Sequence, residues 1–564
     1  MVLQRRNSNS SIDHQSRLLR SQQEASSSLN QSQPGSSYGS TRIAPRGRHK
    51  QTLQAISDQD SNISENETDD PYEHYESDGR SASIPSSYTD SIFSEDDEIP
   101  VTVKDEVINI IRSATPLCVT SFFEYLLAVN SLFMIGHLGS RELGSASLAV
   151  LVFNISGMAV IEGMSTSLDT FCSQAFGARK YHKVGLYFQR CTAMIFTLLL
   201  PIMGTWWWSK HILKHVVAEA DLLDLTQPYL RILCFGTPGL IAFETGKRFL
   251  QSQRIFHAST YVLFFCMPLN ILLNYFFIKY WGFIGAPYAL VATYWIMAFL
   301  LLAYVAFVDG KQCWNGLSKR AFRHWKPMLN LAIPGLIMIE SEYLSFEVLT
   351  IMASYFGTES LAAQTIISNI GSLWYQFPFA IGCAISTRVA IYVGMGSQRS
   401  SRVSVRIAYV VAAFTALISF ILITSLKYPL TLLFTSEDEV IRLSVKSMPI
   451  LAFNQFGDTF NIISAGILRS QGRQKIGSYL NIIAYYGVAL PFSYLFAFYF
   501  ELEITGLWLG LMMGVFILGI SETFYVYKSN WDQILKEALD RDEDEYEVLI
   551  DDDSTVSSFV TSYE

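Results

Sequence analysis

The sequence is poor in charge for its length. Only 16% of its 564 residues are Asp, Glu, Lys or Arg, whereas a soluble protein usually has about a quarter.

The sequence also lacks a P-loop and the HExxH and CxxC patterns of metal sites, so ATP is not expected as the direct energy source and no metal site is predicted. No short apolar stretch follows the N-terminus, so we expect no cleavable signal peptide. Its seven cysteines, an odd number, lie mostly in or beside apolar stretches, which argues against a disulfide framework.

Between two polar ends, the chain is almost continuously apolar. Runs such as residues 191–208 and 410–424 are long enough, with their flanks, for helices that cross about 30 Å of hydrocarbon. The pattern predicts an all-α polytopic membrane protein. We count twelve spans, centred near residues 125, 157, 197, 237, 268, 296, 343, 376, 415, 455, 488 and 516.

Positive charge is unequally divided between the predicted loops. Seventeen Lys and Arg residues lie on the side of the N-terminus, against about five on the other side. This asymmetry predicts that both termini are cytoplasmic. Residues 1–104, rich in Ser, Gln and Asn, predict a disordered tail, and residues 528–564 predict an acidic tail.

The chain matches itself when it is shifted by 218 residues. Pro116 then falls on Pro334, and the motif EYL at 124–126 falls on EYL at 342–344. The shift predicts two parallel six-helix repeats, an N-lobe and a C-lobe, that are related by an axis along the membrane normal. We place the lobes at residues 105–310 and 327–527, with a cytoplasmic linker at 311–326. Such an architecture suits alternating access around a central cleft.

Two carboxylates, Glu124 and Glu342, occupy matching places near the middle of their spans. A charge at this depth costs roughly 2.5 to 3.5 kcal/mol on insertion scales, so each acid must face water, find a partner or hold a proton. We therefore predict that both handle protons or cations. No Lys or Arg is predicted at comparable depth, so internal ion pairs are not expected.

Other polar residues within the spans are secondary candidates. Glu347 and Asp458 are predicted to join the site, while Glu162 and Glu340 can equally cap or bridge helices. On the helix of span seven, Glu340 and Glu347 share one face and Glu342 points elsewhere. The aromatic candidates for a pocket that takes a flat cation and the supporting amides are Tyr343, Tyr375, Tyr486, Asn454 and Asn130.

Three segments, MIGHLGSRELGSASLA, LDTFCSQAFGARKYHKVG and GILRSQGRQKIGSYLNIIAYYGVALPFSYLF, resemble signatures of the multidrug and toxic compound extrusion (MATE) family. The similarity runs over residues 105–527, and the Ser-rich extension resembles the fungal branch. It implies a secondary antiporter without a cofactor, which exports organic, often cationic, compounds against H⁺ or Na⁺. Eukaryotic members are generally coupled to H⁺.

The resemblance also implies roles for particular residues. The two functional glutamates of span seven fall on Glu342 and Glu347, and the acid of span ten falls on Asp458, eleven residues before Arg469. Bacterial members carry an aspartate near Asn130 or Ser131, where this chain has no acid. That departure shifts the expected cation site towards the C-lobe.

Several alternatives stay open. The chain could couple to Na⁺, or flip lipids or oligosaccharides, as in the wider superfamily. A major-facilitator transporter is disfavoured because its usual loop after span two is missing, and no constellation of side chains favours an enzyme. We expect a monomer in contact with membrane lipids, no nucleic-acid partner, and the vacuolar rather than the plasma membrane.

Overall fold

The computed structural model describes residues 102–215 and 220–541, which form helices joined by short turns. The predicted tails lie outside these ranges, except for residues 102–104 and 528–541. The N-lobe helices are α4 Val103–Gly136, α5 Ser140–Phe153, η2 Asn154–Met158, α6 Ala159–Ser165, α7 Ser167–Gly177, α8 Tyr181–Trp207, α9 Ser209–Leu213, α10 Ala220–Ser252, α11 His257–Trp281, η3 Gly282–Ile284 and α12 Gly285–Phe307. Two short turns, η4 Lys311–Cys313 and η5 Lys319–Phe322, lie in the linker. The C-lobe helices are α13 Lys326–Ser354, α14 Thr358–Gly394, α15 Gln398–Leu432, α16 Asp438–Ser470, α17 Gln474–Ile482, η6 Ile483–Ala489, α18 Leu490–Tyr494, η7 Leu495–Tyr499 and α19 Glu503–Tyr527.

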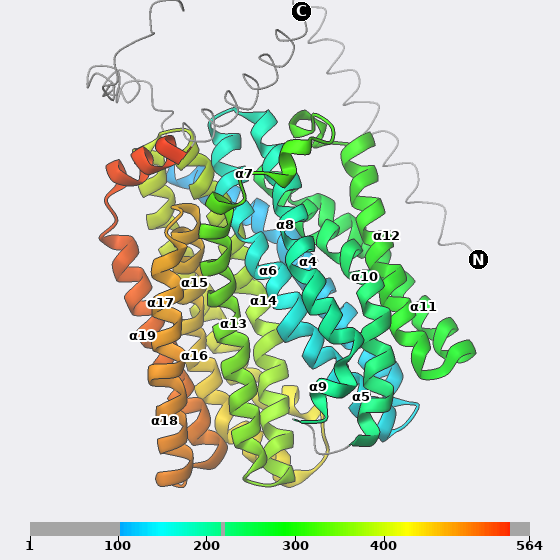
Figure 1. Ribbon diagram of the computed structural model, residues 1–564. Helices are drawn as coiled ribbons and strands as arrows, with labels where there is room; N and C mark the ends of the chain where they lie inside the picture. The colour runs from blue at the N-terminus through cyan, green and yellow to red at the C-terminus, as the bar shows by residue number, and fades with distance from the viewer. Residues whose placement is uncertain (1–101, 216–219, 542–564) are drawn as a thin grey trace, which may run out of the picture. The chain divides into compact units, whose positions relative to one another are not determined.

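These helices confirm the twelve predicted spans. In the N-lobe the spans are α4, the continuous rod from α5 to α7, α8, α10, α11 and α12. In the C-lobe they are α13, α14, α15, α16, the rod from α17 to η7, and α19. Figure 1 shows the first set and the second set as two groups of helices.

Eight helical stretches of the described chain are long and apolar enough to cross a membrane, and one of them contains both α11 and α12. The spans outside this set are α10, α13 and α16. Each of these three helices carries several charged residues inside its length. These charges make the three helices less apolar than the other spans.

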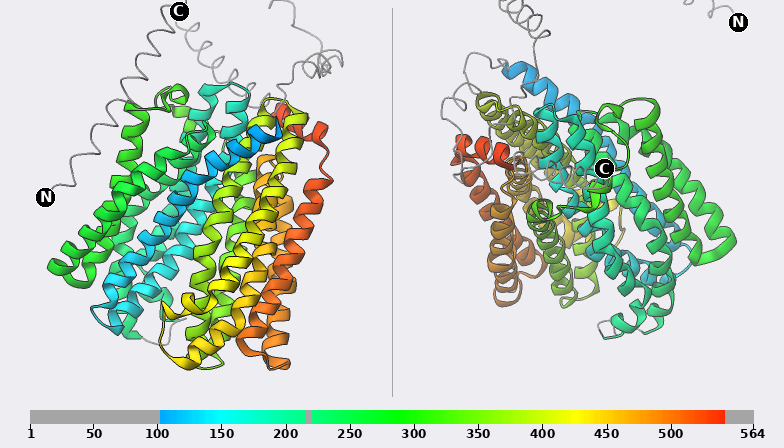
Figure 2. Two further views of the ribbon diagram at one scale, coloured as in Figure 1. Left: turned by 180° about the vertical axis from the view of Figure 1, so that it is seen from behind. Right: turned by 45° about the horizontal axis from the view of Figure 1, so that its top comes forward.

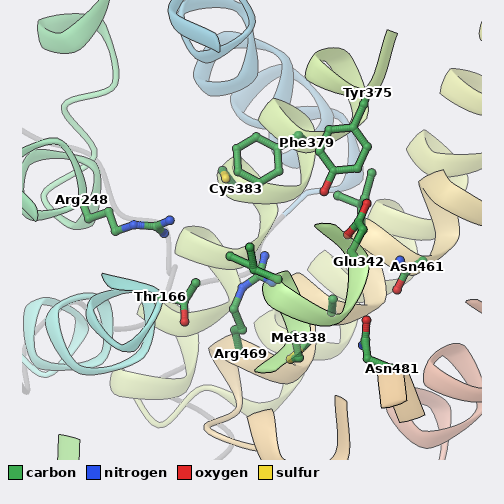
Figure 3. Close-up of a pocket in the computed structure, with 13 residues that line it drawn as sticks. Thr166, Arg248, Met338, Glu342, Tyr375, Phe379, Cys383, Asn461, Arg469 and Asn481 are labelled. Atoms are coloured by element: carbon green, nitrogen blue, oxygen red, sulfur yellow. The ribbon is translucent and has the colours of Figure 1, made fainter. Parts of the chain in front are cut away.

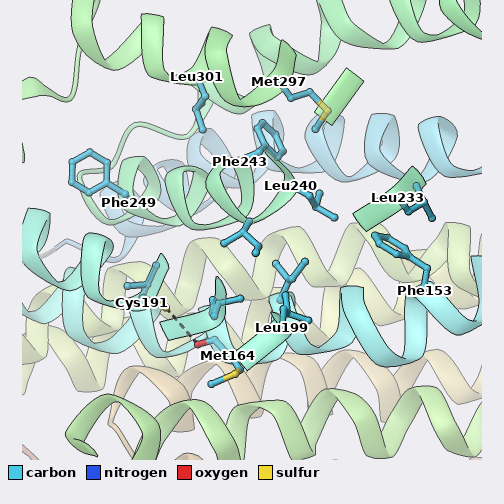
Figure 4. Close-up of a cluster of buried hydrophobic side chains, with 14 of the residues drawn as sticks. Phe153, Met164, Cys191, Leu199, Leu233, Leu240, Phe243, Phe249, Met297 and Leu301 are labelled. Atoms are coloured by element: carbon cyan, nitrogen blue, oxygen red, sulfur yellow. Dashed lines mark hydrogen bonds between the residues drawn. The ribbon is translucent and has the colours of Figure 1, made fainter. Parts of the chain in front are cut away.

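Each lobe has its own apolar core. The N-lobe core gathers fully buried side chains such as Ile161, Leu199 and Phe243 (Figure 4). The C-lobe core gathers side chains such as Leu349, Leu507 and Leu518. Apolar contacts also join the lobes, because the N-lobe core includes Met328 and Ala332 near the start of α13, and Ala114 of α4 packs with Ala380 and Ala384 of α14.

The lobes meet mainly towards one end of the bundle, where α4 begins. Helix α4 packs against α14, as the view from behind shows (Figure 2). Further along this end, α7 packs so closely on α14 that a Cβ on Gly177 or Gly394 would collide with backbone of the other helix. The positive-inside expectation places this end in the cytoplasm, and we call it the inner end.

The inner end is also closed by a buried ion pair between the lobes. Glu106 of α4, which is fully buried, pairs with Arg388 of α14. Tyr392 and Ser404 each donate a hydrogen bond to the same carboxylate, at 2.8 and 2.7 Å. Buried carboxylates are stable only with such partners, so this cluster fixes the closed arrangement of the inner end.

All seven cysteines lie in the described part of the chain, and all are free thiols. This agrees with the prediction that the chain has no disulfide framework.

Candidate functional site

A pocket opens between the lobes, beside α13 (Figure 3). In the close-up, Arg248 reaches towards it from the N-lobe side, and Glu342 lies opposite on the C-lobe side. Its full lining is Thr166, Arg248, Met338, Ile339, Glu342, Tyr375, Phe379, Cys383, Asn461, Ile462, Ala465, Arg469 and Asn481.

Glu342 is the one carboxylate in the pocket lining. Within the described residues, its carboxylate has no hydrogen bond and no ion pair, although the charges of Arg469 and Asp458 are near enough to interact with it. Asp458 accepts a 2.6 Å hydrogen bond from Nδ2 of Asn454, one turn earlier on α16. The structure therefore places Glu342, Asp458 and Asn454 in one electrostatic group.

The other two acids of α13 lie apart from this group. Glu340 and Glu347 are absent from the pocket lining, and neither has a hydrogen-bond partner in the described chain. They share a helix face that Glu342 does not, as helical geometry predicts. Of the two glutamates that the resemblance selected, only Glu342 faces this pocket.

The aromatic candidates occupy three different environments. Tyr375 lines the pocket, and its ring stacks on Phe379 with centroids 5.8 Å apart. Tyr343 instead spans the lobes, donating a 3.1 Å hydrogen bond to Glu162 of α6. Tyr486 is 38% exposed and does not line the pocket.

Asn130 belongs to a network of amides inside the N-lobe. Its Nδ2 donates to Oδ1 of Asn270 at 2.9 Å, and Asn270 donates in turn to Thr293. Asn274 donates to the same Oδ1 at 3.0 Å and to Ser131 at 3.3 Å. Hydrogen-bonded neutral amides thus occupy the region where the resemblance places the bacterial aspartate, and Oδ1 of Asn274 is buried without a partner in the described chain.

Glu124 has an ion-pair partner, so the expectation that the spans contain no internal ion pair is wrong. Lys247 of α10 lies 2.8 Å from Oε1 of Glu124 and 2.9 Å from Oε2 of Glu244. The Lys247 side chain is only 12% exposed and that of Glu244 only 2%. Lys247 is one of the seventeen Lys and Arg residues that the hydropathy pattern places in loops, but α10 continues to Ser252.

A second ion cluster connects the lobes beside the pocket. Nη1 of Arg248 lies 2.7 and 2.8 Å from the two carboxylate oxygens of Asp169, and Nε of Arg248 donates to Ser165. Arg469 of the C-lobe approaches the same carboxylate, with Nε 3.7 Å from Oδ2. The carboxylate of Asp169 in the N-lobe therefore interacts with one arginine from each lobe.

The sequence pattern predicted neither this cluster nor the charged partners of Glu124. Lys247, Arg248 and Arg469 are among the seventeen Lys and Arg residues that the sequence pattern places in loops on the side of the N-terminus. Asp169 and Glu244 were not among the predicted site residues. One signal was available for Lys247 and Arg248, because their segment FETGKRFLQS continues the helix that precedes it and so places both side chains inside the bundle. The sequence alone does not show which helices are neighbours, however, so it does not identify their partners.

Comparisons with known proteins agree on one family. The family model described as MatE matches residues 116–276 and again residues 334–495, starting 218 residues apart. An uncharacterized transporter of Saccharomyces cerevisiae is 37% identical over 463 residues, which cover 80% of this chain and 66% of the relative. Multidrug and toxin extrusion protein 2 of Mus musculus is 30% identical over 439 residues, 77% of each chain. A crystal structure of a eukaryotic MATE transporter aligns with a TM-score of 0.74 at 26% identity, covering 78% of this chain and 99% of that one.

Proposed function

This chain belongs to the MATE family of membrane transporters, and on that premise we propose that it is a proton-coupled antiporter that exports organic cations from the cytosol. Family membership makes it a transporter of small compounds rather than an enzyme. The proton, the cationic substrate and the direction are the parts that we propose.

The observation that supports this proposal most strongly is an asymmetry between duplicated carboxylates. Glu124 forms an ion pair with Lys247, which it shares with Glu244, whereas its repeat mate Glu342 has no ion pair within the described residues. A carboxylate without a fixed partner in a low-dielectric site favours its protonated form or an incoming cation. Glu342 and Asp458 are therefore the groups that we assign to proton and substrate binding.

The coupling follows from competition for the same charge. A proton that enters from the outer side neutralises the Glu342–Asp458 pair, and a bound organic cation loses its attraction and leaves. After the lobes tilt, loss of the proton to the cytosol restores the negative charge that attracts the next cation. Each pH unit supplies about 1.4 kcal/mol, and each net charge moved across 100 mV supplies about 2.3 kcal/mol.

The described contacts between the lobes support an outward-facing arrangement. The pair Glu106–Arg388 and the hydrogen bond from Gln174 to the carbonyl of Ser470 both join the lobes near the inner end. Access from the cytosol requires these contacts to break. The aromatic pair Tyr375–Phe379 gives the pocket a flat surface that suits the face of a delocalised cation.

Sodium is a second candidate for the coupling ion, for a specific reason. Oδ1 of Asn454 and Oγ1 of Thr459, on the helix of Asp458, are buried without hydrogen-bond partners. Oxygen atoms of this kind are ligands for hard cations. Separate H⁺ and Na⁺ gradients distinguish the two ions.

A lipid flippase would use the pocket differently. Arg248 and Arg469 line it, although no Lys or Arg was expected inside the spans. Both arginines face Asp169, however, and Arg248 contacts both of its oxygens. A phosphate head group would have to displace that carboxylate, and for this reason we favour a cationic substrate.

We propose the vacuolar membrane as the location, where the same polarity would load compounds into an acidic lumen. This part rests on the resemblance to the fungal branch. Microscopy of the tagged full-length chain against vacuolar and plasma-membrane markers tests it.

The function is tested by uptake of ethidium into proteoliposomes under an imposed pH gradient. We expect uptake into vesicles with an acidic lumen, and loss of most of it in Glu342→Gln and in Asp458→Asn, with both variants eluting as folded protein. Uptake that follows a Na⁺ gradient instead, flip of a fluorescent phospholipid without ethidium transport, or full activity in both variants contradicts the proposal.

A further inference from the structure

Another carboxylate of the C-lobe, Glu522 of α19, is fully buried and has no ion pair in the described chain. Its Oε1 accepts one long hydrogen bond, 3.4 Å, from Nδ2 of Asn481, and its Oε2 has no partner. A buried carboxyl with so few donors cannot easily remain an anion, because nothing replaces the water that it has lost. It must hold a proton or bind a cation for at least part of the time.

Unpartnered polar atoms occur on the helices around this carboxyl. Oδ1 of Asn461 on α16 and the hydroxyl of Tyr485 on η6 are both buried without hydrogen bonds. Helix α17 approaches closely at Gly477, where a Cβ would lie 3.4 Å from Oε1 of Glu522. Unmatched buried polar groups are rare in proteins, so their presence beside one acid indicates a place built for an exchangeable ligand.

Glu522 is connected to the pocket described above. Asn481, which donates to Glu522, also lines the pocket together with Glu342 and Asn461. The site therefore adjoins the transport pocket and is not an isolated core group.

Glu522 lies nearer the inner end than the other C-lobe acids. The hydroxyl oxygens of Ser464 on α16 and Thr523 on α19 are 3.0 Å apart, which sets the register of these helices. Glu522 is thus level with residues 463–464, about 8 Å further along α16 than Asp458 at 1.5 Å per residue. An ion that moves from Asp458 towards the cytosol passes this level.

The charged and titratable groups that face Glu522 are few. Arg469 of α16 and Glu342 of α13 interact with its charge, and Tyr485 of η6 and Tyr409 of α15 are near enough to sense it. Arg469 attracts a negative charge at Glu522, while Glu342 opposes it. The carboxyls of Glu342 and Glu522 therefore each favour the other being protonated.

We propose that Glu522, with Asn481, Asn461 and Tyr485, is an inner proton-binding site that receives the proton from the Glu342–Asp458 pair. The O–H bond of the protonated Glu342 breaks, the proton passes along the pocket, and a new O–H bond forms at the Glu522 carboxylate. The negative charge moves to Glu342, where it attracts the next substrate, and Glu522 later gives the proton to the cytosol. The relay rests on the proton antiport proposed above.

Proton binding is tested first, on the purified full-length protein and without any substrate. Infrared spectra recorded across a pH series show the C=O band of protonated carboxyls. We expect Glu522→Gln to remove one component of that band and to leave a component that Glu342→Gln removes. If the spectra of Glu522→Gln and wild type coincide at every pH, the assignment is wrong.

The relay is tested by two transport modes of the same variant. In proteoliposomes, we expect Glu522→Gln to reduce uptake of ethidium driven by a pH gradient by about a hundredfold or more, a loss typical of a positioned proton-transfer group. Ethidium exchange at equal pH, which needs no net proton movement, should stay close to wild type and reports a folded pocket. Glu522→Asp, which keeps an ionisable group, should recover part of the driven uptake, whereas a purely structural role would not distinguish it from Gln.

A matched control is Glu503→Gln, the same change at an exposed site in the first turn of the same helix, and it should behave as wild type in both modes. Failure of the relay and failure of the antiport are distinguishable. If the wild type shows no ethidium uptake driven by a pH gradient, both the proton antiport and the relay are wrong. If a pH gradient drives ethidium uptake equally well in the wild type and in Glu522→Gln, only the relay is wrong.

Discussion

Lys247 of α10 lies 2.8 Å from Glu124 of α4, whereas Glu342, the repeat mate of Glu124, has no ion pair in the described residues. The two repeats thus carry a carboxylate at matching places, and only the carboxylate of the N-lobe has a lysine partner. The N-lobe acid has become part of a permanent ion pair. The C-lobe acid has no such partner among the described residues, as the proposed proton exchange requires.

Removal of the lysine should therefore destabilise the N-lobe. Lys247→Gln leaves Glu124 and Glu244 facing each other without a cation, and breaking a buried pair costs roughly 3 to 5 kcal/mol. We expect a lower melting temperature in detergent, measured by intrinsic fluorescence. The double variant Lys247→Gln with Glu124→Gln should recover part of the loss, and equal melting temperatures of Lys247→Gln and wild type would show that the pair contributes nothing.

Cys383 gives chemical access to the pocket. Its free thiol is partly exposed and lines the pocket with Glu342. We expect a small maleimide to inhibit ethidium transport and ethidium to slow the labelling, because the adduct and the substrate occupy the same space. The variant Cys383→Ser should be active and insensitive, and inhibition that persists in it would place the reactive thiol elsewhere, for example at Cys118.

The close contact between α6 and α13 should not tolerate a methyl group. A Cβ on Gly163 would lie 2.5 Å from Cα of Leu336, which is backbone of the opposite lobe. We expect Gly163→Ala to cost about 1 to 3 kcal/mol of the closed inner arrangement, as overpacking usually does, and to slow transport. Gly204→Ala is the matched control, because its Cβ meets nothing within 4 Å inside helix α8; similar effects of both changes would refute the steric explanation.

The ion pair between Glu106 and Arg388 should hold the inner end closed. Glu106→Gln keeps the shape of the side chain but removes the charge that Arg388, Tyr392 and Ser404 all contact. We expect faster hydrogen–deuterium exchange over the first turns of α4. The neighbouring Asp105→Asn is exposed and should exchange as wild type, and unchanged exchange in Glu106→Gln would show that other contacts close this end.

The helices were predictable because bilayer thickness sets their length and an apolar run reveals them. The place of Glu342 in the pocket lining could be expected as well, since an acid in the middle of such a run is costly and must face water, find a partner or hold a proton. The repeat was visible in the coincidence of Pro116 with Pro334, and it gave the two lobes without any structure. These signals all lie within short stretches or at a constant shift.

The charge partners were not predictable, because they join residues far apart in the chain. Arg248 meets Asp169 from 79 residues away, and Lys247 meets Glu124 from 123 residues away. Hydropathy also ended α10 too early, so Lys247 was placed in a loop, whereas Glu522 lay inside the last predicted span and was not selected. Only helix packing brings these groups together.

The most direct test of the account follows the proton itself. Vesicles that contain a pH-sensitive dye and start at equal pH inside and outside are given ethidium outside, in the absence of Na⁺. The account predicts that ethidium entry makes the lumen alkaline, because protons leave in exchange, and that Glu342→Gln abolishes this signal. Entry of ethidium at the normal rate with no change in lumenal pH, or only when Na⁺ is present, would contradict it.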